Sequence, residues 1–138
     1  MAALTPVVPD KVEVLALVEE VLAWDLQGPE LPEPASSLVL VEQFTTYGKV
    51  LADDLGTLCL NIRASSQAGN GAQATLNEAS RRLHLSPPPP GPLAAAHRAQ
   101  NLARLTQALL RSIDQVNDEH ARVTQHAHRH VTTKGASK

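Results

Sequence analysis

The sequence is dominated by a long amphipathic segment between Leu93 and Val123. Its large apolar residues recur every three or four positions, which is the spacing of one helix face: Leu102, Leu105, Leu109, Ile113 and Val116. The opposite face carries Arg104, Gln107 and Arg111. A helix with two such different faces needs a surface to cover its apolar side, so this segment predicts a folded helical protein.

The core that this helix joins must be mainly aliphatic, because 138 residues include only one Trp, one Phe and one Tyr. A chain of this length fits one domain that can bury a core without disulfides or metals. Aromatic-rich, alternating segments typical of strands are scarce, which favours an all-α fold. The single cysteine, Cys59, lies in an apolar helical run and is expected to be a buried thiol.

Four helices are predicted from apolar periodicity and from the breaks between them. Their expected spans are about Pro9 to Asp25, a segment capped by Ser36 or Ser37 and ending near Arg63, Ala72 to Leu85, and Leu93 to between Glu119 and Val123. Prolines, a Gly-Asn-Gly stretch and the run after Ser86 supply the breaks.

Short connections make successive helices antiparallel, so the expected architecture is an up-down four-helix bundle with a short third helix. It occupies residues 9–123, between a flexible segment 1–8 and a disordered, His-rich tail 124–138. The short third helix leaves one end open, which a second copy in a homodimer could close. Gly48 and Gly56 lie on the flank of the second helix, where we expect a neighbouring helix to approach closely.

Charge is distributed unevenly along the chain. Residues 1–92 hold 5 Lys and Arg against 11 Asp and Glu, whereas residues 93–138 hold 7 against 3. The simpler interpretation is that the basic last helix packs against the acidic part of its own chain. The alternative is an acidic partner.

The histidines near the C-terminus are the most suggestive chemical group. They are His120, His126, His128 and His130. A metal site needs a closed and supported set of ligands, and this flexible segment offers none, so no metal is predicted. His120 continues the apolar stripe of the last helix, which predicts a partly buried structural residue.

No catalytic or cofactor-binding residue is predicted. The carboxylate pairs Glu19-Glu20 and Asp53-Asp54 are adjacent on helices and therefore diverge. The stretch Gly69 to Gly71 has no Lys-Ser/Thr after it, so it does not form a phosphate loop. Nucleic acid is not an expected partner either, since the chain is net acidic and has too few aromatic residues for base stacking.

Three segments together carry a family resemblance: EASRRLHL at 78–85, the PPPPGP break, and RAQNLARLTQALLRSIDQV at 98–116. Over residues 12–116 the chain resembles a family of small helical proteins of uncharacterised function from Streptomyces and relatives. That family is loosely linked with natural-product biosynthesis. The resemblance supplies no catalytic residues.

The favoured hypothesis is a non-enzymatic accessory or regulatory protein that contacts an unidentified protein partner through Arg104, Gln107 and Arg111. A small-molecule-binding or catalytic protein is the alternative, with a pocket lined by Trp24, Tyr47, His84 and His97. A nucleic-acid-binding regulator is the third. No secretory signal and no apolar run of membrane-spanning length is visible, so a cytoplasmic location is expected.

Overall fold

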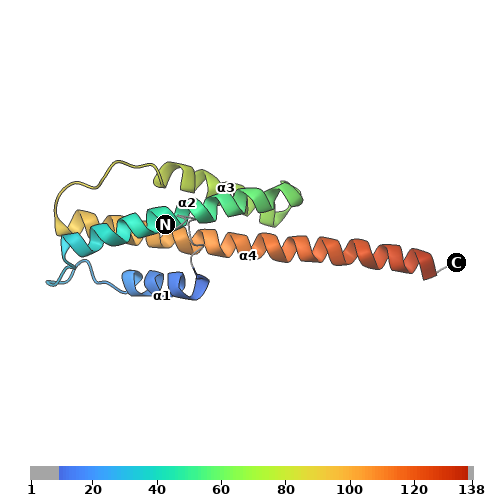
Figure 1. Cartoon of the computed structure of the whole chain (residues 1–138), viewed down its shortest axis with the longest axis horizontal. Coiled ribbons are helices and arrows are strands. Elements are labelled where there is room, and N and C mark those ends of the chain that lie inside the picture. The colour runs from blue at the N-terminus through green and yellow to red at the C-terminus, as the bar shows by residue number, and fades with distance from the viewer. Residues whose placement is uncertain (1–9, 137–138) are drawn as a thin grey trace, which may run out of the picture.

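The computed structural model describes the backbone of residues 10–136 and the side chains as far as residue 125. Four helices make up this part of the chain: α1 (Lys11–Leu22), α2 (Pro34–Leu58), α3 (Gln67–Arg82) and α4 (Pro92–Ala136). A 3-10 turn, Cys59–Asn61, follows α2. Successive helices run in opposite directions (Figure 1), and the described residues contain no strand. The predicted all-α four-helix bundle is confirmed.

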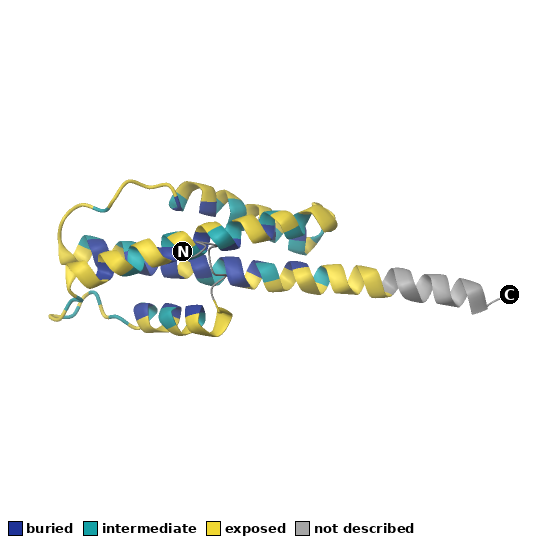
Figure 2. Ribbon diagram, in the orientation of Figure 1, coloured by how far each residue is buried: buried dark blue, intermediate teal, exposed yellow. Residues whose placement is uncertain are grey.

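Helix α4 is the central element of the bundle. It packs against each of the other three helices, most extensively against α2, which runs parallel to it. Helices α1 and α3 lie beside this central pair (Figure 1), and extended contact between α1 and either α2 or α3 is absent from the described residues. Many residues of α4 are therefore buried, as the colouring of its ribbon shows (Figure 2). They include the small residues Ala95, Ala96, Ala99 and Ala103.

Close packing explains one of the two glycines of α2. A Cβ on Gly48 would lie 2.6 Å from Leu83 Cδ2, so the side chain of Leu83 occupies the space that a larger residue would fill. A Cβ on Gly56 would meet nothing within 4 Å. The expected close approach is thus confirmed at Gly48 and wrong at Gly56.

Helix α2 begins earlier than the predicted serine cap. The helix starts at Pro34, and proline is tolerated in the first turn because the N–H that it lacks would have no partner within the helix. Ser36 and Ser37 therefore lie inside the helix. Ser37 is completely buried, and its hydroxyl has no hydrogen-bond partner within the described residues. Neither serine caps the helix.

Helix α3 also begins earlier than predicted, because Ser66 caps it. The Ser66 hydroxyl accepts a hydrogen bond from Gly69 N at 3.0 Å. A Cβ on Gly69 would lie 2.3 Å from Arg63 O, so this tight start requires glycine. The Gly-Asn-Gly stretch that was expected to form a loop is therefore helical.

Helix α4 continues as far as Ala136, beyond the predicted end between Glu119 and Val123, and it projects past the other helices (Figure 1). His120 is exposed rather than partly buried. Cys59 is half-buried, not buried, since it lies at the end of α2. The side chains of His126, His128 and His130 lie outside the described residues, and the predicted flexibility of 124–138 stays a prediction.

Candidate interaction surface

A narrow part of α4 remains uncovered along its length. The exposed residues follow one another at intervals of three, four or seven positions and form what we call the polar strip: His97, Asn101, Arg104, Arg111 and Gln115. This spacing keeps them on one side of the helix. On either side of the strip the helix is buried, for example at Gln100 and Leu105.

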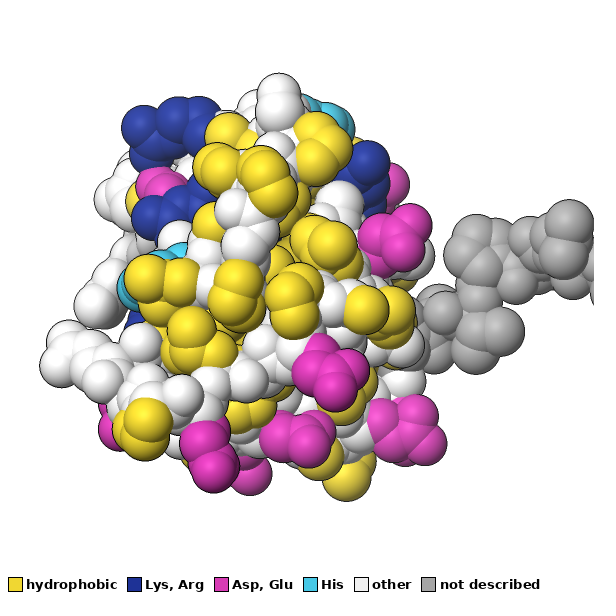
Figure 3. Space-filling view, turned by 90° about the vertical axis from the view of Figure 1, so that its left-hand side faces the viewer, with side chains coloured by type: hydrophobic (Ala, Val, Ile, Leu, Met, Phe, Trp, Pro, Cys, Tyr) yellow, Lys and Arg dark blue, Asp and Glu magenta, His cyan; other side chains and the backbone are white. Residues whose placement is uncertain are grey.

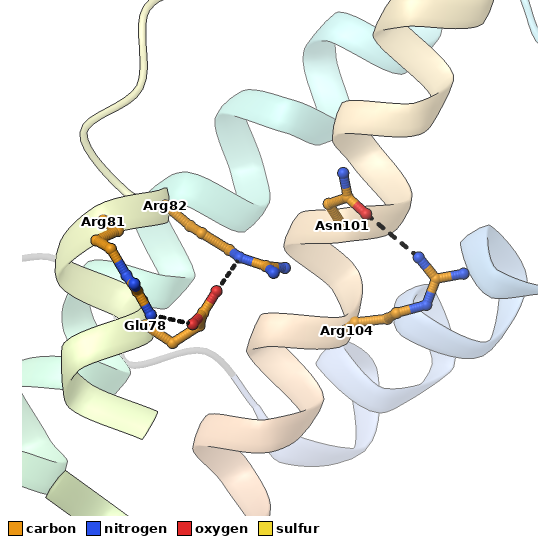
Figure 4. A network of polar contacts seen from close by, with 5 residues as sticks. All are labelled: Glu78, Arg81, Arg82, Asn101 and Arg104. Carbon is orange, nitrogen blue, oxygen red and sulfur yellow. Dashed lines mark hydrogen bonds and ion pairs between the residues drawn. The ribbon is translucent and has the colours of Figure 1, made fainter. Parts of the chain in front are cut away.

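Side-chain contacts place the polar strip between α1 and α3. On the α1 side, Gln100 Nε2 donates to Val21 O at 3.0 Å and to Trp24 O at 3.1 Å. On the α3 side, the hydroxyls of Thr75 and Ser112 share a hydrogen bond of 3.0 Å. Figure 4 shows α4 between these two helices, with Arg82 extending from α3 toward it.

The arginines of the strip are not neutralised by acidic side chains within the described residues. Arg104 donates to Asn101 Oδ1, one turn away on the same helix (Figure 4), and Arg111 makes no ion pair. One described ion pair joins α4 to another helix, and it links Lys11 of α1 to Asp114 of α4 at 2.8 Å. Among the described residues, the expected packing of a basic last helix against an acidic first part therefore includes no ion pair from a base of α4 to an acid of another helix.

Two hollows lie in the crease between α3 and α4, next to the strip. One, of about 260 Å³, is lined by Ala74, Glu78, Arg82, Arg104 and Ala108, among others. The other, of about 510 Å³, lies nearer the projecting end of α4 and includes Gln67, Gly71, Gln115, Asp118 and Arg122. The first is basic on balance, with Arg82 and Arg104 against Glu78, and the second is acidic on balance, with Asp118 and Glu119 against Arg122.

Glu78 holds two of the arginines at the edge of this crease. It pairs with Arg81 at 2.6 Å and also with Arg82 (Figure 4). Desolvation acts to raise the pKa of Glu78, but the charges and hydrogen bonds of Arg82 and Arg81 outweigh it and lower that pKa. Glu78 therefore stays ionised and keeps the Arg82 side chain beside α4.

The structure places the predicted contact residues together on α4, but it does not bring the four predicted pocket residues together. Arg104 and Arg111 are exposed on the strip, whereas Gln107 is half-buried beside it. Of the four residues proposed for a pocket, His84 lines a hollow between α2 and α3 that holds none of the other three. Trp24 and Tyr47 are half-buried against the core, and His97 is exposed on α4.

The end of the bundle that carries the Pro-rich connections is a surface that the sequence did not indicate. Apolar side chains gather over it (Figure 3), with proline counted among them. Four of them are unusually exposed: Leu38, Val39, Leu85 and Leu93. They come from three separate segments of the chain, and only packing brings these segments to one end, so no local pattern could have predicted this patch.

Three observations concern metal binding, the reactivity of the cysteine and membrane spanning. Within them, no three His, Cys, Asp or Glu side chains gather closely enough to hold a metal ion. Burial raises the pKa of the Cys59 thiol, which makes it a poorer nucleophile at neutral pH. None of the helices described is long and apolar enough to cross a membrane.

Comparison with known proteins gives one positive result. No curated protein and no solved structure matches the chain. A model of a family of unknown function, DUF6415, matches residues 12–118, which include all four helices up to the point where α4 projects. Since this match covers most of the chain, the protein belongs to the family of unknown function DUF6415.

Proposed function

We propose that this protein is a non-enzymatic accessory or regulatory protein that binds another protein along the polar strip of α4. The observation that carries the proposal is that Arg104 and Arg111 stay exposed and without an ion pair among the described residues, in a chain with more acidic than basic groups. An intramolecular role for these charges would have predicted acidic partners on α1 or α3. Charge complementarity then favours a partner with an acidic surface.

The shape of the site suits a helical segment of that partner. The strip runs between two helices, and the adjoining crease is lined partly by small residues, Gly71, Ala74 and Ala108. Small side chains let a further helix approach closely, as in other complexes in which a helix lies in a groove. Asp118 and Glu119 in the outer hollow weaken attraction for a uniformly negative ligand such as DNA.

The setting of this function follows from the family resemblance and, for its location, from a sequence in which no secretory signal and no apolar run of membrane-spanning length is visible. We place the protein in the cytoplasm of an actinobacterium and connect it with natural-product biosynthesis. A homodimer is an alternative form of the same protein contact.

Charge reversal tests the proposal. The full tagged chain, immobilised, is used to capture partners from an extract of the source organism, and the double variant Arg104→Glu/Arg111→Glu is compared with it. The double variant should lose the captured protein, and raising the salt concentration should weaken capture by the unchanged chain because exposed charges are screened. Circular dichroism checks that both chains fold.

The matched control reverses two exposed basic residues away from the strip, Lys49→Glu/Arg63→Glu. It should retain the partner. Equal capture by both double variants would contradict the proposal, and capture of another copy of the chain would identify the homodimer. Retention of the unchanged chain on a DNA column at physiological salt, lost in the strip variant, would support the nucleic-acid alternative instead.

A further inference from the structure

A second site lies at the apolar end of the bundle, away from the strip. It is a hollow of about 510 Å³ between α2, the end of α3, the Pro-rich connection and α4. Val41, Leu83 and Leu102 form its base, and of these Leu83 and Leu102 belong to the core. The exposed side chains of Leu38 and Leu85 stand at its rim. A hollow of this size and apolar character is in the range that small ligands occupy.

Charge around the hollow is also uneven. Arg82 and Arg98 line it from the α3 and α4 sides, and Glu42 is the single acidic residue in its lining, on α2. Each arginine is already oriented: Arg98 Nη1 donates to Ser86 O at 2.7 Å, and Arg82 Nε pairs with Glu78. A guanidinium group has five N–H donors, so both arginines keep donors for a ligand.

The wall opposite the core is stiff. Pro87 and Pro88 line the hollow directly after Ser86, whose carbonyl Arg98 holds. Proline fixes its own backbone angle, so this part of the connection loses little freedom when a ligand binds. The hollow is thus largely preformed, which lowers the entropic cost of binding.

We propose that this hollow binds a small carboxylate with an apolar body. The apolar body lies on Val41, Leu83 and Leu102, and the carboxylate accepts hydrogen bonds from Arg98 and Arg82. Arginine is the side chain best matched to a carboxylate because its donors form a planar fork. This site uses none of the residues of the strip, although Arg82 also lines the hollow beside the strip, and it differs from the pocket predicted around Trp24, Tyr47, His84 and His97.

The test uses three soluble probes that share one body and differ in the head group: 4-phenylbutyrate, 4-phenylbutanol and 4-phenylbutylamine. Binding is followed by NMR through amide shifts of the full chain. The acid should bind with a Kd on the order of 1 mM, as expected for a ligand of about twelve heavy atoms. It should bind about tenfold tighter than the alcohol, because charge-assisted hydrogen bonds are lost. The largest shifts should fall around Val41, Leu83 and Leu102.

Two adjacent exposed residues supply matched variants. Leu38 lines the hollow, whereas Val39, which is also exposed, is not part of its lining. Leu38→Glu should weaken the acid severalfold and strengthen the amine, and Val39→Glu should change neither. Arg98→Gln should weaken the acid toward the affinity of the alcohol, while Arg104→Gln on the strip leaves it unchanged.

Several results would overturn the proposal. These are equal affinity for acid and amine, shifts centred outside the hollow, or no saturable binding of the acid at concentrations of about 10 mM, roughly tenfold above the expected Kd. If a polypeptide binds in the hollow and the phenylbutyl acid does not, the site belongs to a protein partner and the proposal is wrong. These measurements do not depend on whether the strip variants lose their protein partner, so the two proposals can fail separately.

Discussion

At the scale of single residues, the two glycines of α2 differ only in what lies opposite them. Gly48 is buried and faces the Leu83 side chain, which belongs to the core. Gly56 has open space at the same position. Glycine in a helix interior costs about 1 kcal/mol relative to alanine, so only Gly48 has a packing reason to be retained.

The first prediction follows from this difference. Gly56→Ala should raise the free energy of unfolding by about 0.5–1 kcal/mol through helix propensity. Gly48→Ala should lower it by about 1 kcal/mol or more, because forcing Leu83 to move costs more than propensity returns. Urea denaturation measures both. The loss at Gly48 should vanish in a Leu83→Ala background, and persistence there would show that Leu83 is not the cause.

At the scale of the elements, α1 depends on α4 for its position. Its apolar residues Val14, Val18 and Val21 are buried, but it makes no extended contact with α2 or α3 among the described residues. Gln100 of α4 bonds to Val21 O and Trp24 O at the C-terminal end of α1. Carbonyls at a helix end lack the usual partner within the helix. Val21 O also accepts from Trp24 N at 3.2 Å, so Gln100 gives it a second donor, supplies a donor to Trp24 O and fixes the end of α1.

The second prediction is that Gln100→Ala loosens α1 selectively. Removing the two hydrogen bonds that Gln100 donates to Val21 O and Trp24 O should lower the free energy of unfolding by about 2 kcal/mol. Amide hydrogen exchange should accelerate in Lys11–Leu22 more than in α2. Asn101→Ala, an exposed neighbour, should change stability by less than about 0.5 kcal/mol. Uniform acceleration across all helices would argue against a local role for Gln100.

At the scale of the whole molecule, the core ends well before the chain does. Val116 is the last residue of the buried cluster, whereas α4 continues to Ala136 and projects from the bundle (Figure 1). The match to the DUF6415 family ends at residue 118, close to the same point. Folding of the bundle therefore requires α4 only as far as its last buried turn.

The third prediction concerns truncation. A chain ending at Gln125 should have a thermal unfolding midpoint within about 2 °C of the full chain, because no core residue is removed. A chain ending at Ser112 loses Ile113 and the fully buried Val116, and its free energy of unfolding should fall by about 3 kcal/mol or more. A large loss of stability in the longer chain would show that the projecting segment stabilises the bundle.

Much of this fold could be predicted from local pattern. The apolar stripe through Leu102, Leu109 and Val116 requires a helix with one covered face, and prolines set the breaks between helices. Errors fell at the helix ends. Ser36 and Ser37 were expected to cap α2, but the helix begins earlier, at Pro34. The glycines that were expected to form a loop instead belong to the beginning of α3.

The sequence by itself determined the helical class and the faces of each helix, because both depend on residues a few positions apart. Only the tertiary structure decided that α4 is central, that Arg104 and Arg111 lie between α1 and α3 without acidic partners among the described residues, and that Leu38, Leu85 and Arg98 surround one hollow. The reason is physical. Which surfaces meet depends on the packing of helices far apart along the chain. Because the hydrophobic effect is non-directional, the apolar face of a helix does not specify which other helix covers it.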